Sequence, residues 1–241
     1  MAELGGLGKT ALRSGATQGI MPTGFSNGRG PAMPAPMTLV IGTKRFSSWS
    51  LRPWLAAKMA SVDFDEVLIA LRRPETKAEI LKHSPSGKVP CLIHGALTIW
   101  DSLAICEYLA ELHPTLWPEG REARAVARAV SAEMHSGYPN LRNACSMDVC
   151  EVTPLADIPP EVQAEIDRIK ALWNDCRARF GTKDGGPFLF GRFSAADAMF
   201  APVVTRFTTF AIPLDPVSQA YCDAIWSLPP MQEWKRAACD A

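Results

Sequence analysis

Residues 84–109 read SPSGKVPCLIHGALTIWDSLAICEYL, and the fold prediction starts from this stretch. Val89-Pro90 opens a short apolar run, a His-Gly turn follows, and a second apolar run ends at Asp101-Ser102. Apolar side chains then recur at steps of three along one face of a predicted helix: Leu103, Cys106, Leu109 and Leu112. Two strands joined by a tight turn and followed by a helix make a ββα unit.

The junction at Asp101-Ser102 brings a carboxylate, a hydroxyl and unpaired helix amides to one point. Such a point can capture a small carboxylate with an adjacent ammonium group. Pro90 stands where the first strand begins, a tolerated place for a residue without an N–H. The simpler alternative is a β-hairpin followed by a helix, in which Asp-Ser acts only as the N-cap.

The stretch resembles the glutathione-binding half of the glutathione transferase family. In that family the residue before a cis proline offers its backbone N–H and C=O to the cysteinyl part of glutathione, and an acid–Ser pair holds the γ-glutamyl end. The resemblance gives the first role to Val89, with Pro90 as the cis proline, and the second to Asp101 and Ser102. Lys88 is a further candidate for the glycyl carboxylate. Glutathione is then the expected co-substrate, and no metal is expected.

The elements before this unit complete a four-stranded mixed sheet. They are a strand at 38–41, a helix at about 50–60, a strand at 64–69 and a short helix within 75–82. A sheet of this order is a thioredoxin-like α/β fold, predicted over residues 37–113. This domain is the place where the family that the stretch resembles binds glutathione.

The second domain is predicted to be all-helical, over residues 119–241. Helical patterns cover 121–138, 161–180, 195–211, 217–226 and 230–238, and prolines break 148–160 into a loop. Ser194 and Asp197 match the family's Ser-x-x-Asp element, which is physically a capping box with a folding role. A small α/β domain followed by a helical one is also the architecture of that family, so the resemblance covers about residues 37–241.

The loop after the first strand reads FSSWSLRPW from Phe46 to Trp54 and precedes a helix. The N-terminus of a helix favours negative charge through its free amides and its dipole. A thiol with an ordinary pKa of about 8.5 is mostly protonated at neutral pH, so a hydroxyl donor and helix amides would stabilise its thiolate.

Among transferases, this serine string is most similar to the zeta-class pattern of a bacterial-type enzyme. The resemblance puts the activating hydroxyl at Ser47, with Ser48 second. The sequence departs from that pattern at Trp49, where it has cysteine, and at Pro53, where it has valine. The alternative is that the serines only cap the helix.

Three side chains are candidates for an electrophile pocket: His135, Tyr138 and Arg142. They are placed on the first long helix of the second domain, which faces that pocket in the family. Lys44 and Arg45 are expected either to meet substrate anions or to form a solvated loop. The tryptophans are expected to pack in the core rather than to stack on a ligand.

The composition excludes several classes of partner. The 25 basic and 25 acidic residues cancel, which gives no electrostatic reason to expect nucleic acid or an anionic membrane. No apolar stretch reaches the roughly 18 residues that a membrane span needs. The seven cysteines are odd in number and scattered, which argues against a disulfide framework or a zinc site and for a reducing, cytoplasmic location.

Residues 1–36 are rich in Gly, Ala, Pro and Ser and show no sustained periodicity. Such a segment is expected to be a disordered tail, since it cannot bury enough apolar surface. An upstream start codon, a cloning remnant and a weak organellar presequence all remain open as its origin.

These features together predict a cytoplasmic, serine-type glutathione transferase that conjugates glutathione to small electrophiles in detoxification. A homodimer is expected, as is usual in the family. Two alternatives remain: a glutathione-dependent isomerase of the maleylacetoacetate type, and a non-catalytic binding or assembly module with the same fold.

Overall fold

The computed structural model describes residues 36–181 and 185–240. The predicted tail, residues 1–36, lies outside the described residues except for Pro36. The two domain ranges, 37–113 and 119–241, stay predictions, and the elements within them are described below.

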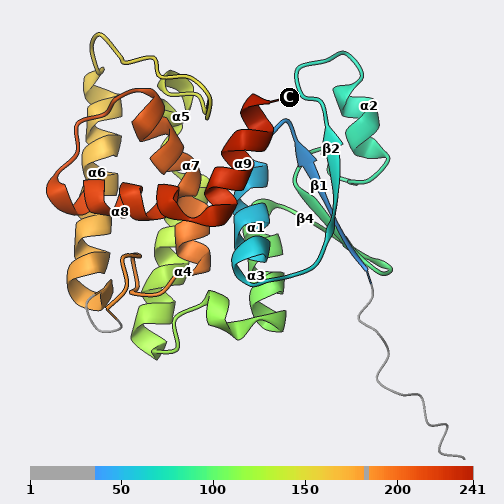
Figure 1. Cartoon of the computed structure of the whole chain (residues 1–241), viewed down its shortest axis with the longest axis horizontal. Helices are drawn as coiled ribbons and strands as arrows, with labels where there is room; N and C mark the ends of the chain where they lie inside the picture. The colour runs from blue at the N-terminus through green and yellow to red at the C-terminus, as the bar shows by residue number, and fades with distance from the viewer. Residues whose placement is uncertain (1–35, 182–184, 241) are drawn as a thin grey trace, which may run out of the picture. The chain divides into compact units, whose positions relative to one another are not determined.

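The N-terminal half holds a four-stranded mixed sheet, as predicted (Figure 1). Its strands are β1 (Met37–Gly42), β2 (Asp65–Ile69), β3 (Cys91–His94) and β4 (Leu97–Trp100), in the spatial order β2-β1-β3-β4. Strand β1 runs parallel to β2 and antiparallel to β3, and β3 pairs with β4 as an antiparallel hairpin. This is the thioredoxin-like arrangement that the order of the elements indicated.

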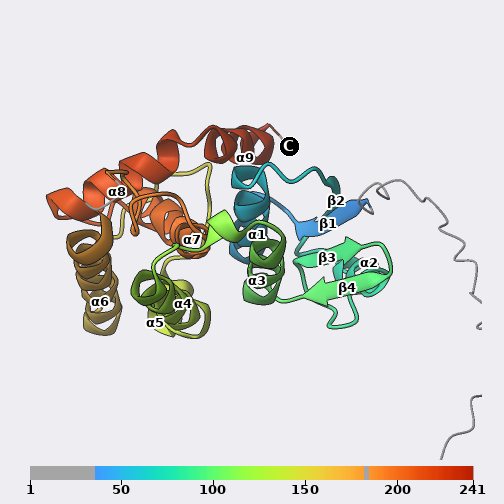
Figure 2. The ribbon, with the colours of Figure 1, turned by 90° about the horizontal axis from the view of Figure 1, so that it is seen from below.

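Helices cover both faces of the sheet (Figure 2). Helices α1 (Ser48–Met59) and α3 (Ser102–Leu112) pack together on one face, and the short α2 (Thr76–Leu81) lies on the other. Alternating side chains of β1 account for this, because Leu39 and Ile41 join the main core while Val40 packs with Ile80 of α2.

The C-terminal half is helical. Its helices are α4 (Arg121–Ser136), α5 (Pro139–Ala144), α6 (Pro160–Cys176), α7 (Ala195–Thr209), α8 (Pro216–Ser227) and α9 (Pro229–Cys239); a 3₁₀ turn, Pro114–Leu116, precedes them and a π turn, Arg177–Gly181, follows α6. Helix α7 is buried along almost its whole length and contacts α1, α4 and α8.

The predicted capping box is confirmed at the start of α7. There the Asp197 carboxylate accepts from the Ser194 and Leu189 amides at 2.8 and 3.1 Å, and burial raises the pKa of Asp197 to about 6.

The first long helix ends earlier than predicted. Helix α4 stops at Ser136, and Tyr138 has a left-handed backbone with φ of 62°. Pro139 follows Tyr138, and a residue before proline is disfavoured from the right-handed helical region. Placing Tyr138 and Arg142 on the first long helix was therefore wrong, and Arg142 lies on α5.

The loop after β1 is anchored rather than solvated. Arg45 donates to Asp148 through Nε and Nη2 at 2.8–2.9 Å, and Lys44 pairs with Glu66 at 2.7 Å. Trp234 of α9 donates to the Lys44 carbonyl at 2.9 Å. These contacts fix the start of α1 against the C-terminal half.

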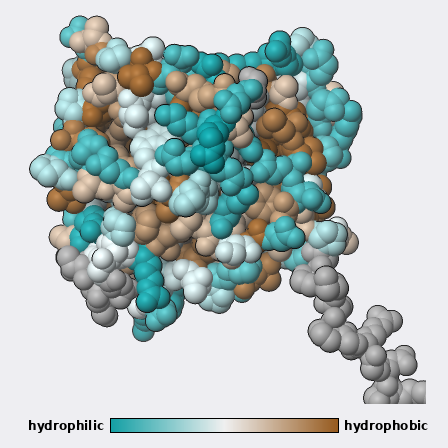
Figure 3. Space-filling view, in the orientation of Figure 1, coloured by the Kyte–Doolittle hydropathy of each residue, from teal (hydrophilic) through white to brown (hydrophobic). Residues whose placement is uncertain are grey.

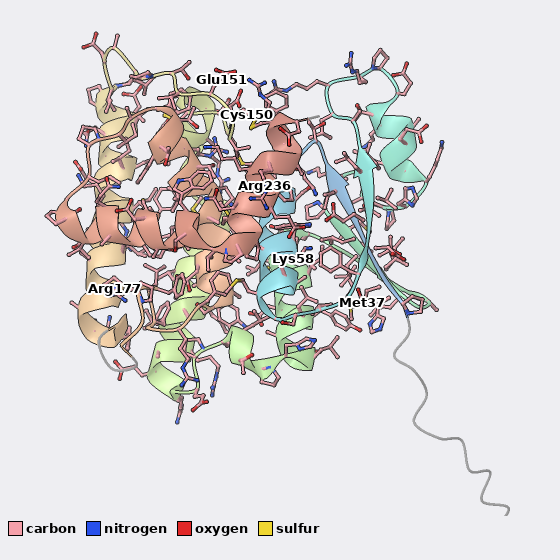
Figure 4. The ribbon with its side chains drawn as sticks, in the orientation of Figure 1. Met37, Lys58, Cys150, Glu151, Arg177 and Arg236 are labelled. Carbon is pink, nitrogen blue, oxygen red and sulfur yellow. A yellow bond between two sulfur atoms is a disulfide. The ribbon has the colours of Figure 1, made fainter. Side chains whose placement is uncertain are left out.

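A disulfide joins Cys150 to Cys239 across 89 residues of sequence, and Figure 4 places Cys150 beside the end of α9. The expectation that the cysteines carry no disulfide was wrong here. The two residues lie far apart in sequence, and only the packing of α9 beside the loop after α5 brings them together. The other cysteines of the described ranges are free and buried: Cys91, Cys106, Cys145, Cys176 and Cys222.

The described parts hold no helix long and apolar enough to cross a membrane. Figure 3 shows one face of the molecule, mostly covered by hydrophilic residues with smaller hydrophobic patches between them.

The disulfide should stabilise the fold by closing a long loop. Replacing Cys239 with serine should lower the free energy of unfolding by roughly 2–4 kcal/mol. Guanidinium unfolding with and without a reductant tests this. Reductant should lower the stability of the native protein to the level of Cys239→Ser and leave that variant unchanged. Equal stability of both proteins under oxidising conditions would contradict the expectation.

Candidate functional site

A cavity of about 630 Å³ opens beside the start of α3. Its lining comes from the N-terminus of α1, the loop before β3, the β4–α3 junction and the end of α4: Trp49, Ser86, Lys88, Val89, Pro90, Trp100, Asp101, Ser102 and His135. The structure thus gathers the predicted glutathione-binding residues, Lys88, Val89, Pro90, Asp101 and Ser102, around one cavity. Of the three candidates for an electrophile pocket, His135 lines it.

The Val89–Pro90 peptide bond is cis, as predicted. Val89 lies just before β3, outside any strand. In the described ranges, neither its N–H nor its C=O takes part in a backbone hydrogen bond of a turn or loop. Since backbone polar groups are normally paired, these two groups can serve a ligand. Lys88 is exposed and lines the cavity next to Val89.

Asp101 is the N-cap of α3 and also faces the cavity. Its Oδ1 accepts from the Leu103 and Ala104 amides at 2.9 and 3.2 Å. Its backbone has φ of 80°, which few residues other than glycine adopt and which aspartate tolerates better than most. Asp101 therefore caps α3 through Oδ1, and the alternative in which Asp-Ser acts only as the N-cap is not decided by this contact.

The second oxygen of Asp101 contacts His135, which also lines the cavity. Asp101 Oδ2 lies 3.1 Å from His135 Nε2, and this pair joins α3 to the last turn of α4. Burial lowers the pKa of His135, while the charge of Asp101 acts in the opposite direction. His135 Nδ1 is buried and has no hydrogen-bond partner in the part of the chain that the structure describes.

Trp49 and Arg52 are site residues that the sequence reasoning missed. Trp49 was expected to pack in the core, but its side chain lines the cavity and is 37% exposed. Arg52 Cζ lies 4.3 Å from the centre of the Trp49 ring, and Arg142 Cζ lies 4.8 Å from it. The i, i+3 spacing of Trp49 and Arg52 at a predicted helix start was the one feature of the sequence that could have indicated their contact.

Arg52 is the most unusual charged group near the cavity. Its side chain is fully buried, and Nη1 donates to Ser102 Oγ at 3.4 Å. Burial, and next the nearby positive charge of Arg142, lower the pKa of Arg52 to about 9. Ser102 is itself buried and also lines the cavity.

The two serines predicted to activate a thiol differ in their contacts. Ser47 is the N-cap of α1, accepts from the Ser50 amide at 3.4 Å and donates to Ser50 Oγ at 2.7 Å. Ser48 is the first residue of α1 and follows the N-cap directly. Both are buried at the start of α1 beside Trp49, and neither belongs to the cavity lining.

Tyr138 and Arg142 brace the end of α4 instead of lining the cavity. The Tyr138 hydroxyl donates to Glu133 at 2.6 Å, and burial raises the pKa of this phenol. Arg142 donates to the carbonyls of Gly137, Met134 and His135. These contacts hold the turn that carries His135. In residues 36–181 and 185–240 no group of three or more His, Cys, Asp or Glu side chains is placed to hold a metal ion.

Comparisons with known proteins agree with this arrangement. The sequence profile of the glutathione S-transferase N-terminal domain matches residues 46–112, and that of the C-terminal domain matches residues 159–234. The chain is 39% identical over 98 residues to a probable maleylacetoacetate isomerase of Caenorhabditis elegans, covering 40% of this chain and 45% of that protein. It therefore spans less than half the length of that relative.

A second relative and a solved structure extend the match. The maleylacetoacetate isomerase of Rattus norvegicus is 30% identical over 174 residues, which cover 70% of this chain and 77% of that protein. The fold also matches the theta class glutathione S-transferase of Xanthomonas axonopodis pv. citri, solved with glutathione bound. That match has a TM-score of 0.62 at 24% identity and covers 86% of this chain and 100% of the other.

The contact between His135 and Asp101 predicts the direction of a titration shift. Because the charge of Asp101 raises the pKa of His135, replacing Asp101 with asparagine should lower this pKa further. Imidazole signals followed by NMR over a pH series measure it. A higher His135 pKa in Asp101→Asn would show that the carboxylate does not act on the imidazole.

Proposed function

Because the chain belongs to the glutathione S-transferase family, we propose that it binds glutathione in the cavity beside α3 and conjugates it to small electrophiles. One observation carries this proposal. The cavity is bordered at once by Val89, whose backbone groups make no turn or loop hydrogen bond, and by the Asp101-Ser102 pair at a helix start.

The proposed binding mode assigns each end of glutathione to one set of groups. The cysteinyl backbone pairs with the N–H and C=O of Val89, as an added strand would. The γ-glutamyl carboxylate lies at Ser102 and the α3 amides, and its ammonium group meets Asp101. Lys88 faces the glycyl carboxylate. A peptide with two carboxylates and one ammonium group fits this distribution of charge.

The proposed chemistry uses the start of α1. A serine hydroxyl donates to the glutathione sulfur, and the free amides of α1 favour the thiolate, so the thiol releases its proton at a lower pH. The thiolate then attacks the electrophile, which forms a C–S bond and expels the leaving group. Ser48 is favoured over Ser47 for this donation, because the Ser47 proton is committed to Ser50.

The electrophile is proposed to enter beside Trp49 and His135, which line the cavity with their ring centres 5.4 Å apart. Tyr138 and Arg142 would support this side through the turn that carries His135. A homodimer, a cytoplasmic location and a role in detoxification belong to the same proposal, but the Cys150–Cys239 disulfide removes the argument from the cysteines for a reducing compartment.

A glutathione-dependent isomerisation of the maleylacetoacetate type is the second candidate. The serine string at the start of α1 and the two isomerase relatives favour it. In that reaction the thiolate would add to the substrate and leave again, so glutathione would be regenerated. A non-catalytic module is disfavoured, since a scaffold does not require a site with free backbone groups.

Binding and turnover test the proposal together. The protein should be retained on immobilised glutathione and should consume glutathione with a generic electrophile, whereas an isomerase would turn over without net consumption.

Asp101→Ala should weaken glutathione binding by about tenfold or more through loss of a charged hydrogen bond. The surface variant Asp167→Ala is the matched control and should bind normally. Failure of the native protein to bind glutathione would refute the proposal.

Matched serine variants test the activation step. Ser48→Ala should lower turnover near neutral pH by roughly 10²-fold, the scale of losing one anion-stabilising donor, with little change in glutathione affinity. Raising the pH should recover part of the loss, because hydroxide then removes the proton. Ser47→Ala should mainly cost about 1 kcal/mol of stability through loss of the helix cap. The reverse pattern would assign the donation to Ser47, and unchanged turnover in both variants would exclude serine-type activation.

A further inference from the structure

The disulfide between Cys150 and Cys239 differs from the free cysteines of residues 36–181 and 185–240 in its access to solvent. Cys239 is exposed at the end of α9, and Cys150 is half-buried in the loop after α5. The five free cysteines are all buried, and burial raises the pKa of each of their thiols. Thiol chemistry in this part of the chain is therefore confined to the disulfide.

The segment just before α1 is held from one side by α9, the helix that carries Cys239. Trp234 of α9 donates through Nε1 to the Lys44 carbonyl at 2.9 Å. The Trp234 ring also meets the ring of Trp54 in α1, with the two centres 5.0 Å apart. Helix α9 thus contacts both the segment that leads into α1 and the helix itself.

The loop that carries Cys150 holds the same segment from another side. Arg45 donates to both oxygens of Asp148 at 2.8–2.9 Å and to Glu151 at 3.2 Å. Cys150 lies between these two acids in sequence, and its amide donates to Asp148 at 3.0 Å. The disulfide therefore ties together the two supports of the segment before α1, namely α9 and this loop.

That segment leads directly into the serines proposed to activate the thiol. Ser47 follows Lys44-Arg45-Phe46 and is the N-cap of α1, and Ser48 is the first residue of the helix. A misplacement of about 1 Å in a catalytic group can lower a rate by about 10²-fold. How firmly the segment is held therefore bears on the proposed reaction.

We propose that the Cys150–Cys239 pair is a thiol-exchange site for glutathione, and that its redox state sets how firmly the activating serine is held. The regulatory half of this inference rests on the proposed function. Exposed disulfides are more readily reduced than buried structural ones. Arg236, also exposed, lies one helical turn before Cys239 on α9 (Figure 4), so a positive charge accompanies the accessible sulfur. This charge suits a thiol that carries carboxylates.

The exchange proceeds in two balanced steps. A glutathione thiolate attacks the Cys239 sulfur, the S–S bond of the pair breaks, and Cys150 leaves as a thiolate that takes up a proton. A second glutathione thiolate attacks the glutathione sulfur of this mixed disulfide, which releases Cys239 as a thiolate and glutathione disulfide as the product. Two glutathione molecules thus supply the two electrons that reduce the pair, and glutathione disulfide reverses both steps.

Mass spectrometry after acid quenching and alkylation tests the exchange. The oxidised native protein is incubated, in its folded state, with glutathione and glutathione disulfide in varied ratios. A glutathione adduct at Cys239 should appear first and the reduced pair next, and glutathione disulfide should restore the S–S bond. Cys222→Ala removes a buried free thiol and is the matched control, which should behave identically. A pair that excess glutathione reduces only in denaturant would overturn the proposal.

Turnover without the disulfide tests the consequence for the site. The double variant Cys150→Ser/Cys239→Ser should keep its glutathione affinity and turn over roughly tenfold more slowly near neutral pH than the oxidised native protein in its first turnovers. The thiol of bound glutathione should also titrate at higher pH in this variant, a change that lower stability alone would not cause. If the variant does not fold, native protein with the pair reduced and alkylated gives the same comparison.

Arg45→Met separates this path from a general loosening of the fold. Arg45 is the side chain through which the loop of Cys150 holds the segment before α1. In Arg45→Met, removing the disulfide should change turnover by less than about twofold, because coupled contacts are not additive. An undiminished effect in Arg45→Met, or no effect in the native background, would overturn the regulatory role. A native protein that forms the Cys239 adduct yet conjugates nothing would refute the proposed function, and the regulatory role with it.

Discussion

The burial of α1 is the constraint on which the rest of the structure depends. This helix lies on the sheet, contacts α3, α7 and α9, and is buried from Ser50 to Ala57. A helix buried on all sides must have a partner for each of its polar groups. Ser47 and Ser50 bond to each other and to backbone amides of the chain around them. Arg52 is the exception, and its exposed neighbour Trp49 marks the place where the helix meets the cavity.

The same constraint explains why the site forms where two halves of the chain meet. The cavity receives Trp49 from α1, Asp101 and Ser102 from the start of α3, and His135 from the end of α4. Packing of α1 against both α3 and α7 fixes these elements relative to one another. Asp101 then performs two tasks with its two oxygens, one for the fold of α3 and one for the contact with His135. A capping role and a binding role are therefore compatible in this residue.

Local sequence patterns predicted the parts of the structure that local interactions decide. The hairpin and the capping box at Ser194 follow from spacing and turn chemistry within a few residues, whereas the cis Val89-Pro90 bond was implied by the family resemblance. The features that were missed depend on distant segments that packing brings together. The disulfide between Cys150 and Cys239 spans 89 residues, and the contact between His135 and Asp101 joins two helices. The end of α4 at Ser136 was missed because helical periodicity outweighed the signal of Pro139.

The overall balance of charge in the sequence likewise gave no indication of the charges near the site. The chain has equal numbers of acidic and basic residues, yet the charges of Arg142 and Arg206 add to burial in lowering the pKa of Arg52, and the charge of Arg142 adds to burial in lowering the pKa of Arg206. Arg142 and Arg206 find backbone carbonyls as acceptors, and these dipoles offset part of their charge. Arg52 has a tryptophan ring and a serine hydroxyl, which are weaker partners. The positive charge of Arg52 thus lies beside Ser102, which lines the cavity.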